Sequence, residues 1–140
     1  MNMSYLNAPL LNLCFLTILE GDLQKPKVLI VENEISIALD LSDLLEEEIN
    51  ANVHLSSTYE FEKAFFQTLP DVLIIDCSPE FKFSDTVVNY LNHGSVRVIA
   101  TTASSKAHPI LEPIICGHFS KPIDPQELVK TVRSISSTLN

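Results

Sequence analysis

Short runs of apolar residues alternate along this chain with longer segments in which apolar residues recur at helical spacing. Several of the short runs are almost continuous in Val, Ile and Leu, which is typical of strands buried on both faces. The predicted strands span residues 27–31, 53–55, 72–75, 96–100 and 118–120. The predicted helices span residues 35–49, 59–68, 84–92 and a last segment that begins at residue 125. This alternation predicts an α/β fold, in which helices cover both faces of a parallel sheet.

Two of these helices carry start signals in the sequence. Asp124 is a natural N-cap residue, followed by Pro125 at the first helical position and Glu127 in the first turn. Ser57 and Glu60 have the spacing of a capping box, in which each side chain accepts a backbone N–H. We therefore expect a sharp start of the last helix at Pro125 and a capped start of the second helix.

The chain has 140 residues, which suits one domain. Residues 1–25 have few charges and no clear periodicity, so they are predicted to form an N-terminal extension to a domain at 26–140. The apolar stretch 9–19 is too short to span a bilayer and lacks the basic start of a secretory signal. Three interpretations of this stretch remain. It could be an extra element, packed or loosely ordered, or a segment that binds a membrane surface or a partner, or the result of a misassigned translation start.

Composition narrows the function without defining it. The formal net charge is −9 and the pI is about 4.7, which argues against direct nucleic-acid binding because such binding depends on Lys and Arg. The three cysteines, Cys14, Cys77 and Cys116, are odd in number and lack metal-ligand spacing. We expect them to be buried thiols in a reducing cytoplasm.

Polar side chains follow the apolar runs at the points where the predicted strands end. These residues are Glu32 with Asn33, Asp76, Thr102 and Lys121. The carboxyl ends of parallel strands meet at one edge of the sheet, which is where open α/β proteins bind ligands. Two acids, a hydroxyl and an amine gathered at that edge form a set suited to phosphoryl chemistry.

The motifs VLIVENE, PDVLIIDC, VIATTA and FSKPID occur in this order, each at the end of a predicted strand. Together they resemble the receiver domain of bacterial two-component response regulators, and the resemblance extends over residues 26–139. It implies a stand-alone, CheY-like receiver with a flavodoxin-like, doubly wound sheet of five parallel strands in the order 2-1-3-4-5. In that family a sensor histidine kinase transfers a phosphoryl group to one aspartate, so the resemblance implies a signalling switch and no enzyme.

The resemblance also implies a phosphoacceptor and a metal site. Asp76 would be the phosphorylated aspartate, with its carboxylate as the nucleophile. Glu32, Asn33, Asp76 and the backbone carbonyl of Ser78 match the positions that hold Mg²⁺ in the family. Asn33 departs from the family pattern, which has a carboxylate there, and an amide carries no charge. We therefore expect weakened Mg²⁺ binding and altered phosphorylation or dephosphorylation.

Four further residues match positions of the family's switch. Thr102 matches the hydroxyl that bonds an attached phosphoryl group, and Lys121 matches the ammonium that pairs with another phosphoryl oxygen. His118 lies where the family often has an aromatic residue that turns inward on activation, although an ordinary strand histidine is the alternative. Pro122 is the candidate for a cis peptide bond. No residue is expected to be catalytic.

The segment between Thr102 and Lys121 departs from the family pattern. It is short for a strand, a loop and a helix, and Pro109 and Pro113 interrupt it. We therefore expect a shortened or irregular fourth helix. His108, in the same segment, shows no ligand spacing and is expected at the surface.

Three hypotheses for function follow. The first is a switch phosphorylated on Asp76 by a sensor histidine kinase or phosphotransfer protein and read out by a downstream protein target. The second is a pseudo-receiver, a protein-interaction module that works without phosphorylation. The third, a flavin- or nucleotide-binding enzyme, is disfavoured because the chain has only three glycines and no Gly-rich phosphate loop. We expect no membrane partner. The resemblance also implies that two copies of the chain can form a homodimer through the face of the fourth and fifth helices.

Overall fold

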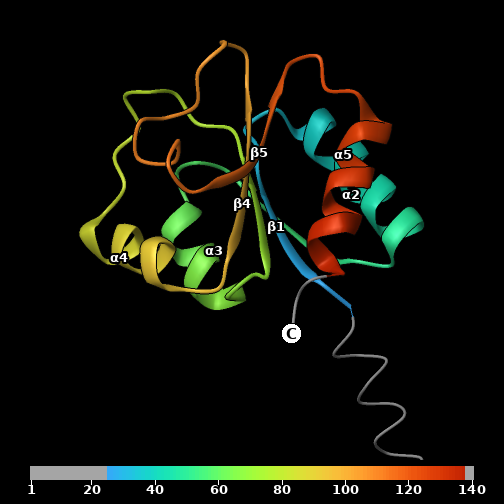
Figure 1. Cartoon of the computed structure of the whole chain (residues 1–140), viewed down its shortest axis with the longest axis horizontal. Helices are drawn as coiled ribbons and strands as arrows, with labels where there is room; N and C mark the ends of the chain where they lie inside the picture. Colours follow the sequence, from blue (N-terminus) through green and yellow to red (C-terminus); the bar gives the residue numbers. More distant parts are fainter. Residues whose placement is uncertain (1–24, 138–140) are drawn as a thin grey trace, which may run out of the picture.

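A computed structural model of the chain describes residues 25–137. Five strands form one parallel sheet in the order β2-β1-β3-β4-β5. Helices lie on both sides of this sheet (Figure 1). The predicted α/β fold and its strand order are therefore confirmed. The expectations for residues 1–24 and for Cys14 lie outside the described residues.

The bounds of the elements agree closely with the apolar pattern. The strands are β1 (Lys27–Val31), β2 (Asn52–Ser56), β3 (Val72–Ile75), β4 (Arg97–Thr102) and β5 (Ile115–Ser120). The helices are α2 (Ile35–Ile49), α3 (Phe61–Thr68), α4 (Asp85–His93) and α5 (Pro125–Ser136). Among the described residues, no helix combines the length and the apolarity needed to cross a membrane.

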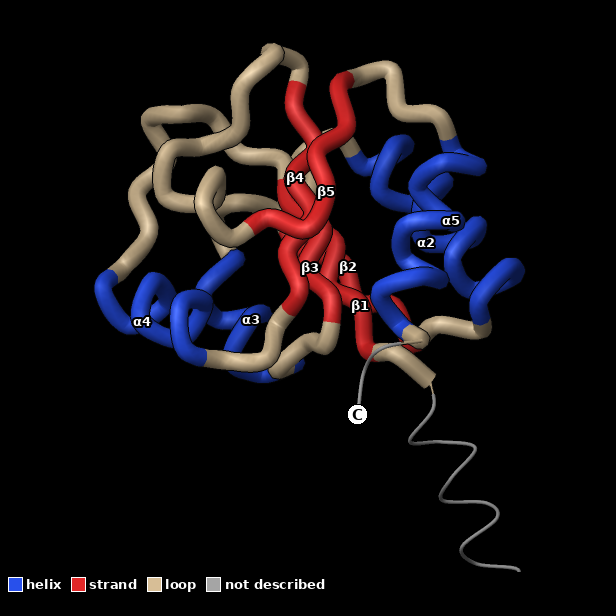
Figure 2. Tube along the Cα trace, viewed as in Figure 1, coloured by secondary structure: helices blue, strands red, loops and turns tan. Residues whose placement is uncertain are grey.

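Two apolar layers enclose the sheet. Along β1, Val28 and Ile30 belong to the layer of α2 and α5, whereas Leu29 and Val31 belong to the layer of α3 and α4 (Figure 2). All four side chains are at most 1% exposed. Because both faces of the central strands are covered, β1 and β3 need apolar residues at successive positions and not at alternate ones.

The two expected helix starts differ in outcome. The Asp124 carboxylate accepts the backbone N–H groups of Gln126 and Glu127, and Pro125 occupies the first turn, so the predicted start of α5 is confirmed. The capping box of α3 is formed only in part. The Ser57 hydroxyl accepts the Glu60 N–H at 3.4 Å, but the Glu60 side chain makes no capping bond, and α3 begins at Phe61, two residues after the predicted start at residue 59.

The passage from β4 to β5 contains no helix within the described chain. Residues 103–114 form bends and turns, with hydrogen bonds from the Leu111 N–H to the His108 carbonyl and from the Ile115 N–H to the Leu111 carbonyl. The fourth helix, which was expected to be shortened or irregular, is therefore missing from this segment. One face of β5 consequently stays open, and its alternate residues Cys116, His118 and Ser120 are exposed. Of the two helices expected to form the dimer face, only the last one, α5, is therefore present among the described residues.

His108 is buried, so its expected place at the surface was wrong. The imidazole Nε2 lies 2.6 Å from the Phe81 carbonyl oxygen, and Nδ1 accepts the Ile110 N–H at 3.1 Å. The ring also meets Phe83 edge to face at 4.9 Å. This histidine joins the loop after β3 to the loop after β4, in place of the packing that a helix would provide.

Replacing Asp124 with alanine is expected to destabilise the domain by about 1 kcal/mol, because two N–H groups of the first turn of α5 lose their acceptor. Urea denaturation followed by circular dichroism measures the change. Asp43→Ala, at an exposed position of α2, is the control and is expected to lose no stability. Equal losses in the two variants would contradict the capping role.

Candidate functional site

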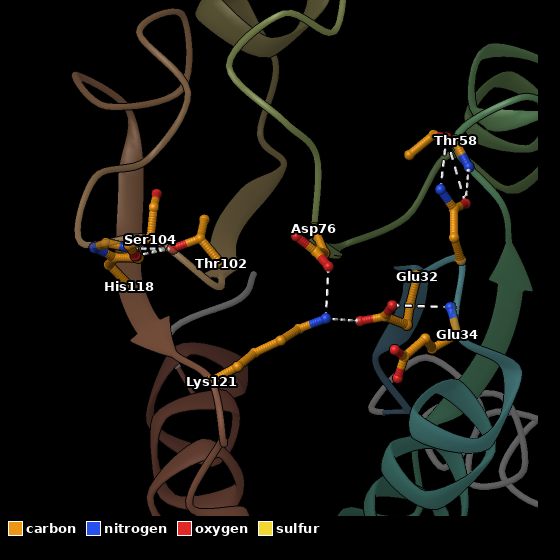
Figure 3. Close-up of polar contacts among 9 residues, drawn as sticks. Glu32, Glu34, Thr58, Asp76, Thr102, Ser104, His118 and Lys121 are labelled. Atoms are coloured by element: carbon orange, nitrogen blue, oxygen red, sulfur yellow. Dashed lines mark hydrogen bonds and ion pairs between the residues drawn. The ribbon is translucent and has the colours of Figure 1, made fainter.

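Three strand ends bring two carboxylates and an ammonium together. Glu32 follows β1, Asp76 follows β3 and Lys121 follows β5, each still fixed by a backbone hydrogen bond to its neighbouring strand. The Lys121 Nζ lies 2.7 Å from the Glu32 Oε1 and 2.6 Å from the Asp76 Oδ2 (Figure 3). The contact joins residues that are 89 and 45 positions apart in the sequence.

Burial makes the ammonium necessary. The Glu32 side chain is only 4% exposed, compared with 26% for Asp76 and 20% for Lys121. The second oxygen of Glu32 accepts the Glu34 N–H at 3.0 Å, so this buried carboxylate has a partner on each side. Two carboxylates and one ammonium leave the cluster with one net negative charge, and removal of the ammonium would leave a buried charge uncompensated.

The carboxylates also fix the protonation state of Lys121. Burial works to lower the pKa of the Lys121 ammonium, but the hydrogen bonds and charges of Asp76 and Glu32 outweigh it and raise the pKa above the usual 10.5. A raised lysine pKa stabilises the fold at every pH below the unfolded value, and this contribution is lost only as the pH rises through the folded value. Lys121 is therefore a permanent cation at neutral pH.

A hollow of about 400 Å³ opens beside Asp76. Loops that follow the carboxyl ends of four strands line it, with Asn33, Thr58, Asp76, Cys77, Ser78, Pro79, Phe81, Thr102, Ala103 and Ser104. The expected gathering at this edge of the sheet therefore includes Thr102 as well as the charged cluster. Its volume can hold a small ligand next to the carboxylate.

Thr102 faces β5, and its hydroxyl is not hydrogen-bonded to Asp76. Its hydroxyl donates to the Ser104 carbonyl at 2.5 Å and lies 2.9 Å from the Nε2 of His118 (Figure 3). Since the single hydroxyl proton goes to Ser104, the oxygen accepts from the ring, which assigns the His118 proton to Nε2. The strand histidine and the strand-end hydroxyl thus form one unit.

Asn33 makes its hydrogen bonds to Thr58. The Asn33 Oδ1 accepts the Thr58 backbone N–H at 2.8 Å and lies 3.3 Å from the hydroxyl, while the Asn33 Nδ2 donates to that hydroxyl at 3.0 Å. Sequence reasoning missed Thr58, although a Ser-Ser-Thr run between a strand and a helix is typical of turns with side-chain hydrogen bonds.

The other expected metal ligands have oxygen atoms of the kind that binds Mg²⁺, but most of these oxygens already have partners within the chain. Carboxylates of Glu32 and Asp76 are suitable ligands, but both share the Lys121 ammonium. The Ser78 carbonyl already accepts the Phe81 N–H at 3.0 Å and keeps one lone pair. No group of three His, Cys, Asp or Glu side chains with metal-binding geometry occurs among residues 25–137.

Two neighbours of the site complete its description. The peptide bond between Lys121 and Pro122 is cis. Cys77 is buried beside Asp76, and desolvation together with the Asp76 charge raises the pKa of its thiol to about 12, so it stays protonated and unreactive. Cys116 is exposed on β5, which contradicts the expectation that the cysteines are buried.

Comparison with solved structures identifies the fold. The chain resembles a response regulator receiver protein from Burkholderia phymatum (TM-score 0.61, 24% identity, covering 82% of this chain and 98% of that one). It also resembles a CheY-like receiver domain protein from Methanospirillum hungatei (TM-score 0.64, 15% identity, 81% and 94%). A third match is the response regulatory domain of protein mrkE from Klebsiella pneumoniae (TM-score 0.63, 16% identity, 79% and 95%).

These matches show that the chain has the fold of response regulator receiver domains over most of its length. No protein-family model and no curated protein matches the sequence. The sequence identities to these structures are low. The roles of the site residues therefore have to be inferred from their own geometry.

Replacing Lys121 with methionine is expected to destabilise the domain by about 3 kcal/mol at pH 7, because the buried Glu32 carboxylate then faces Asp76 without a counter-charge. Urea denaturation followed by circular dichroism measures the loss. Lys130→Met, on the exposed face of α5, is the control and is expected to lose no stability. Equal losses in the two variants would contradict this account of the cluster.

Proposed function

We propose that the chain is a receiver of a two-component system, a signalling switch that accepts a phosphoryl group on Asp76. The observation that carries this proposal is the position of the Asp76 carboxylate, at the edge of the hollow and 2.6 Å from the Lys121 Nζ. The receiver fold, which the chain shares with the solved structures, supports it.

The chemistry is a nucleophilic displacement at phosphorus. An Asp76 oxygen forms the new bond to phosphorus while the bond from phosphorus to the donor breaks, and the donor histidine, or the carboxylate of a small acyl phosphate, leaves with that electron pair. The product is a mixed anhydride with more negative charge in the hollow. Lys121 is already charged and adjacent, so it can pair with a phosphoryl oxygen as it releases a carboxylate.

Thr102 supplies the readout in this proposal. Its hydroxyl is held by Ser104 and His118 in the present state, and it lines the same hollow as Asp76. A phosphoryl oxygen would compete for that hydroxyl, and its capture would release His118 on the open face of β5. Phosphorylation thereby shifts the population of β5 conformations, which a downstream protein target can recognise.

Mg²⁺ is proposed as the cofactor, held by Glu32, Asp76 and the Ser78 carbonyl and weakly because Asn33 is engaged elsewhere. When bound, it neutralises the negative charge that the carboxylate and the phosphoryl oxygens bring together.

An apolar stripe supports a protein donor. Ile35 and Leu39 are 64% and 48% exposed on the first turns of α2, one helical turn apart and just after Glu32. A sensor histidine kinase or a phosphotransfer protein could cover this stripe while it presents a phosphohistidine to the hollow. The proposal implies a cytoplasmic location, where Cys77 and Cys116 stay reduced.

Incubation of the full chain with acetyl phosphate and MgCl₂, followed by intact mass measurement, tests the proposal. The expected result is a gain of one phosphoryl group that hydroxylamine removes, as for an acyl phosphate. Asp76→Asn is expected to gain none, whereas Asp85→Asn, at an exposed position of α4, behaves like the natural chain. An adduct that persists in Asp76→Asn, or no adduct at any Mg²⁺ concentration, would overturn the assignment.

The second candidate is a phosphorylation-independent pseudo-receiver that binds a protein partner. The engagement of Asn33 by Thr58 favours it, because one of the four expected metal ligands then has its partner within the chain. A natural chain that stays unmodified in the acetyl phosphate experiment would support this candidate.

A further inference from the structure

Asn33 and Thr58 form a contact that joins two loops above the sheet. Asn33 lies between β1 and α2, and Thr58 lies between β2 and α3. Both residues line the hollow that contains Asp76. In Figure 3, Thr58 lies on the side of Glu32 that is remote from Lys121, so Asn33 and the Lys121 ammonium have their partners in opposite directions.

The contact uses all of the acceptor capacity of the Asn33 amide. A carbonyl oxygen has two lone pairs. The Asn33 Oδ1 accepts the Thr58 N–H at 2.8 Å and faces the Thr58 hydroxyl at 3.3 Å, while the Nδ2 donates to that same hydroxyl at 3.0 Å. As long as Thr58 holds the amide from both sides, no lone pair of Asn33 is free for a cation.

We propose that Thr58 is a positioning residue that lowers the affinity of the acidic cluster for Mg²⁺ by holding Asn33 out of the cation's reach. This inference rests on the proposed function for the place of the cation, and it assigns the weakness of the site to two causes. One is the missing charge at position 33, and the other is the Thr58 contact, which a charged residue at position 33 would not by itself remove.

The size of the effect follows from solvent exposure. The Asn33–Thr58 bonds are exposed to water, so the contact competes with hydration and holds the amide only moderately. Loss of an outer hydrogen bond that orients a metal ligand typically changes metal affinity by 10–100-fold, and the lower end applies to an exposed contact. Removal of the Thr58 hydroxyl is therefore expected to tighten Mg²⁺ binding by roughly tenfold.

Isothermal titration calorimetry of the full chain with MgCl₂, without any phosphoryl donor, measures this affinity; the chain has no Trp to report binding by fluorescence. Thr58→Val removes the hydroxyl at nearly constant shape and is expected to bind Mg²⁺ roughly tenfold more tightly. Thr58→Ser keeps the hydroxyl and is expected to match the natural chain. Thr86→Val, at an exposed position of α4, is the matched control and leaves the affinity unchanged.

A carboxylate at position 33 separates the two causes. Asn33→Asp restores the charge, but its oxygen can still accept the Thr58 N–H and hydroxyl, so its gain in affinity is expected to be larger in the Thr58→Val background than in the natural one. Urea midpoints within the range of the Thr86→Val control show that the variants stay folded.

Two results would overturn the inference. One is an unchanged Mg²⁺ affinity in folded Thr58→Val. The other is the same gain from Asn33→Asp with and without the Thr58 hydroxyl. Both are read from binding alone, so they are independent of whether Asp76 accepts a phosphoryl group. A chain that binds Mg²⁺ as predicted but stays unmodified by acetyl phosphate would refute the proposed function and leave the role of Thr58 intact.

Discussion

The structure of this site depends on one ammonium held between two carboxylates. Glu32 is almost fully buried at the end of β1, and a buried carboxylate needs a counter-charge to remain ionised. Lys121, which follows β5 and is 89 residues away in the sequence, provides this counter-charge, and the same Nζ contacts Asp76. Because the three residues leave the ends of β1, β3 and β5, the ion pairs can form only when the sheet is assembled in its observed order.

Several polar side chains around the hollow bind other groups of the chain. Lys121 binds the two carboxylates, Thr102 binds Ser104 and His118, and Asn33 binds Thr58. An incoming anion or cation that binds these groups therefore has to exchange existing hydrogen bonds for new ones. A site built in this way has a defined resting state, and its affinity for ligands is set by the difference between two sets of contacts.

The segment between β4 and β5 determines which surface is exposed next to the site. With no helix there among the described residues, the outward face of β5 is open, and His118 lies on it while it contacts Thr102. Burial of His108 compensates for the missing helix by connecting two loops through the Phe81 carbonyl and the Ile110 N–H. The fold is thus retained, although no helix of the described chain covers the face of β5 next to Thr102 and His118.

The sequence by itself determined the strands, most helix bounds and the edge of the sheet at which Glu32, Asp76, Thr102 and Lys121 meet. These features follow from local periodicity and from the geometry of parallel strands, which place strand ends at one edge. Only the tertiary structure decided which groups bind each other there. Thr58 captures Asn33 and His108 becomes buried because of contacts between loops far apart in the chain, and hydrogen-bond partners at such distances leave no periodic signal in the sequence.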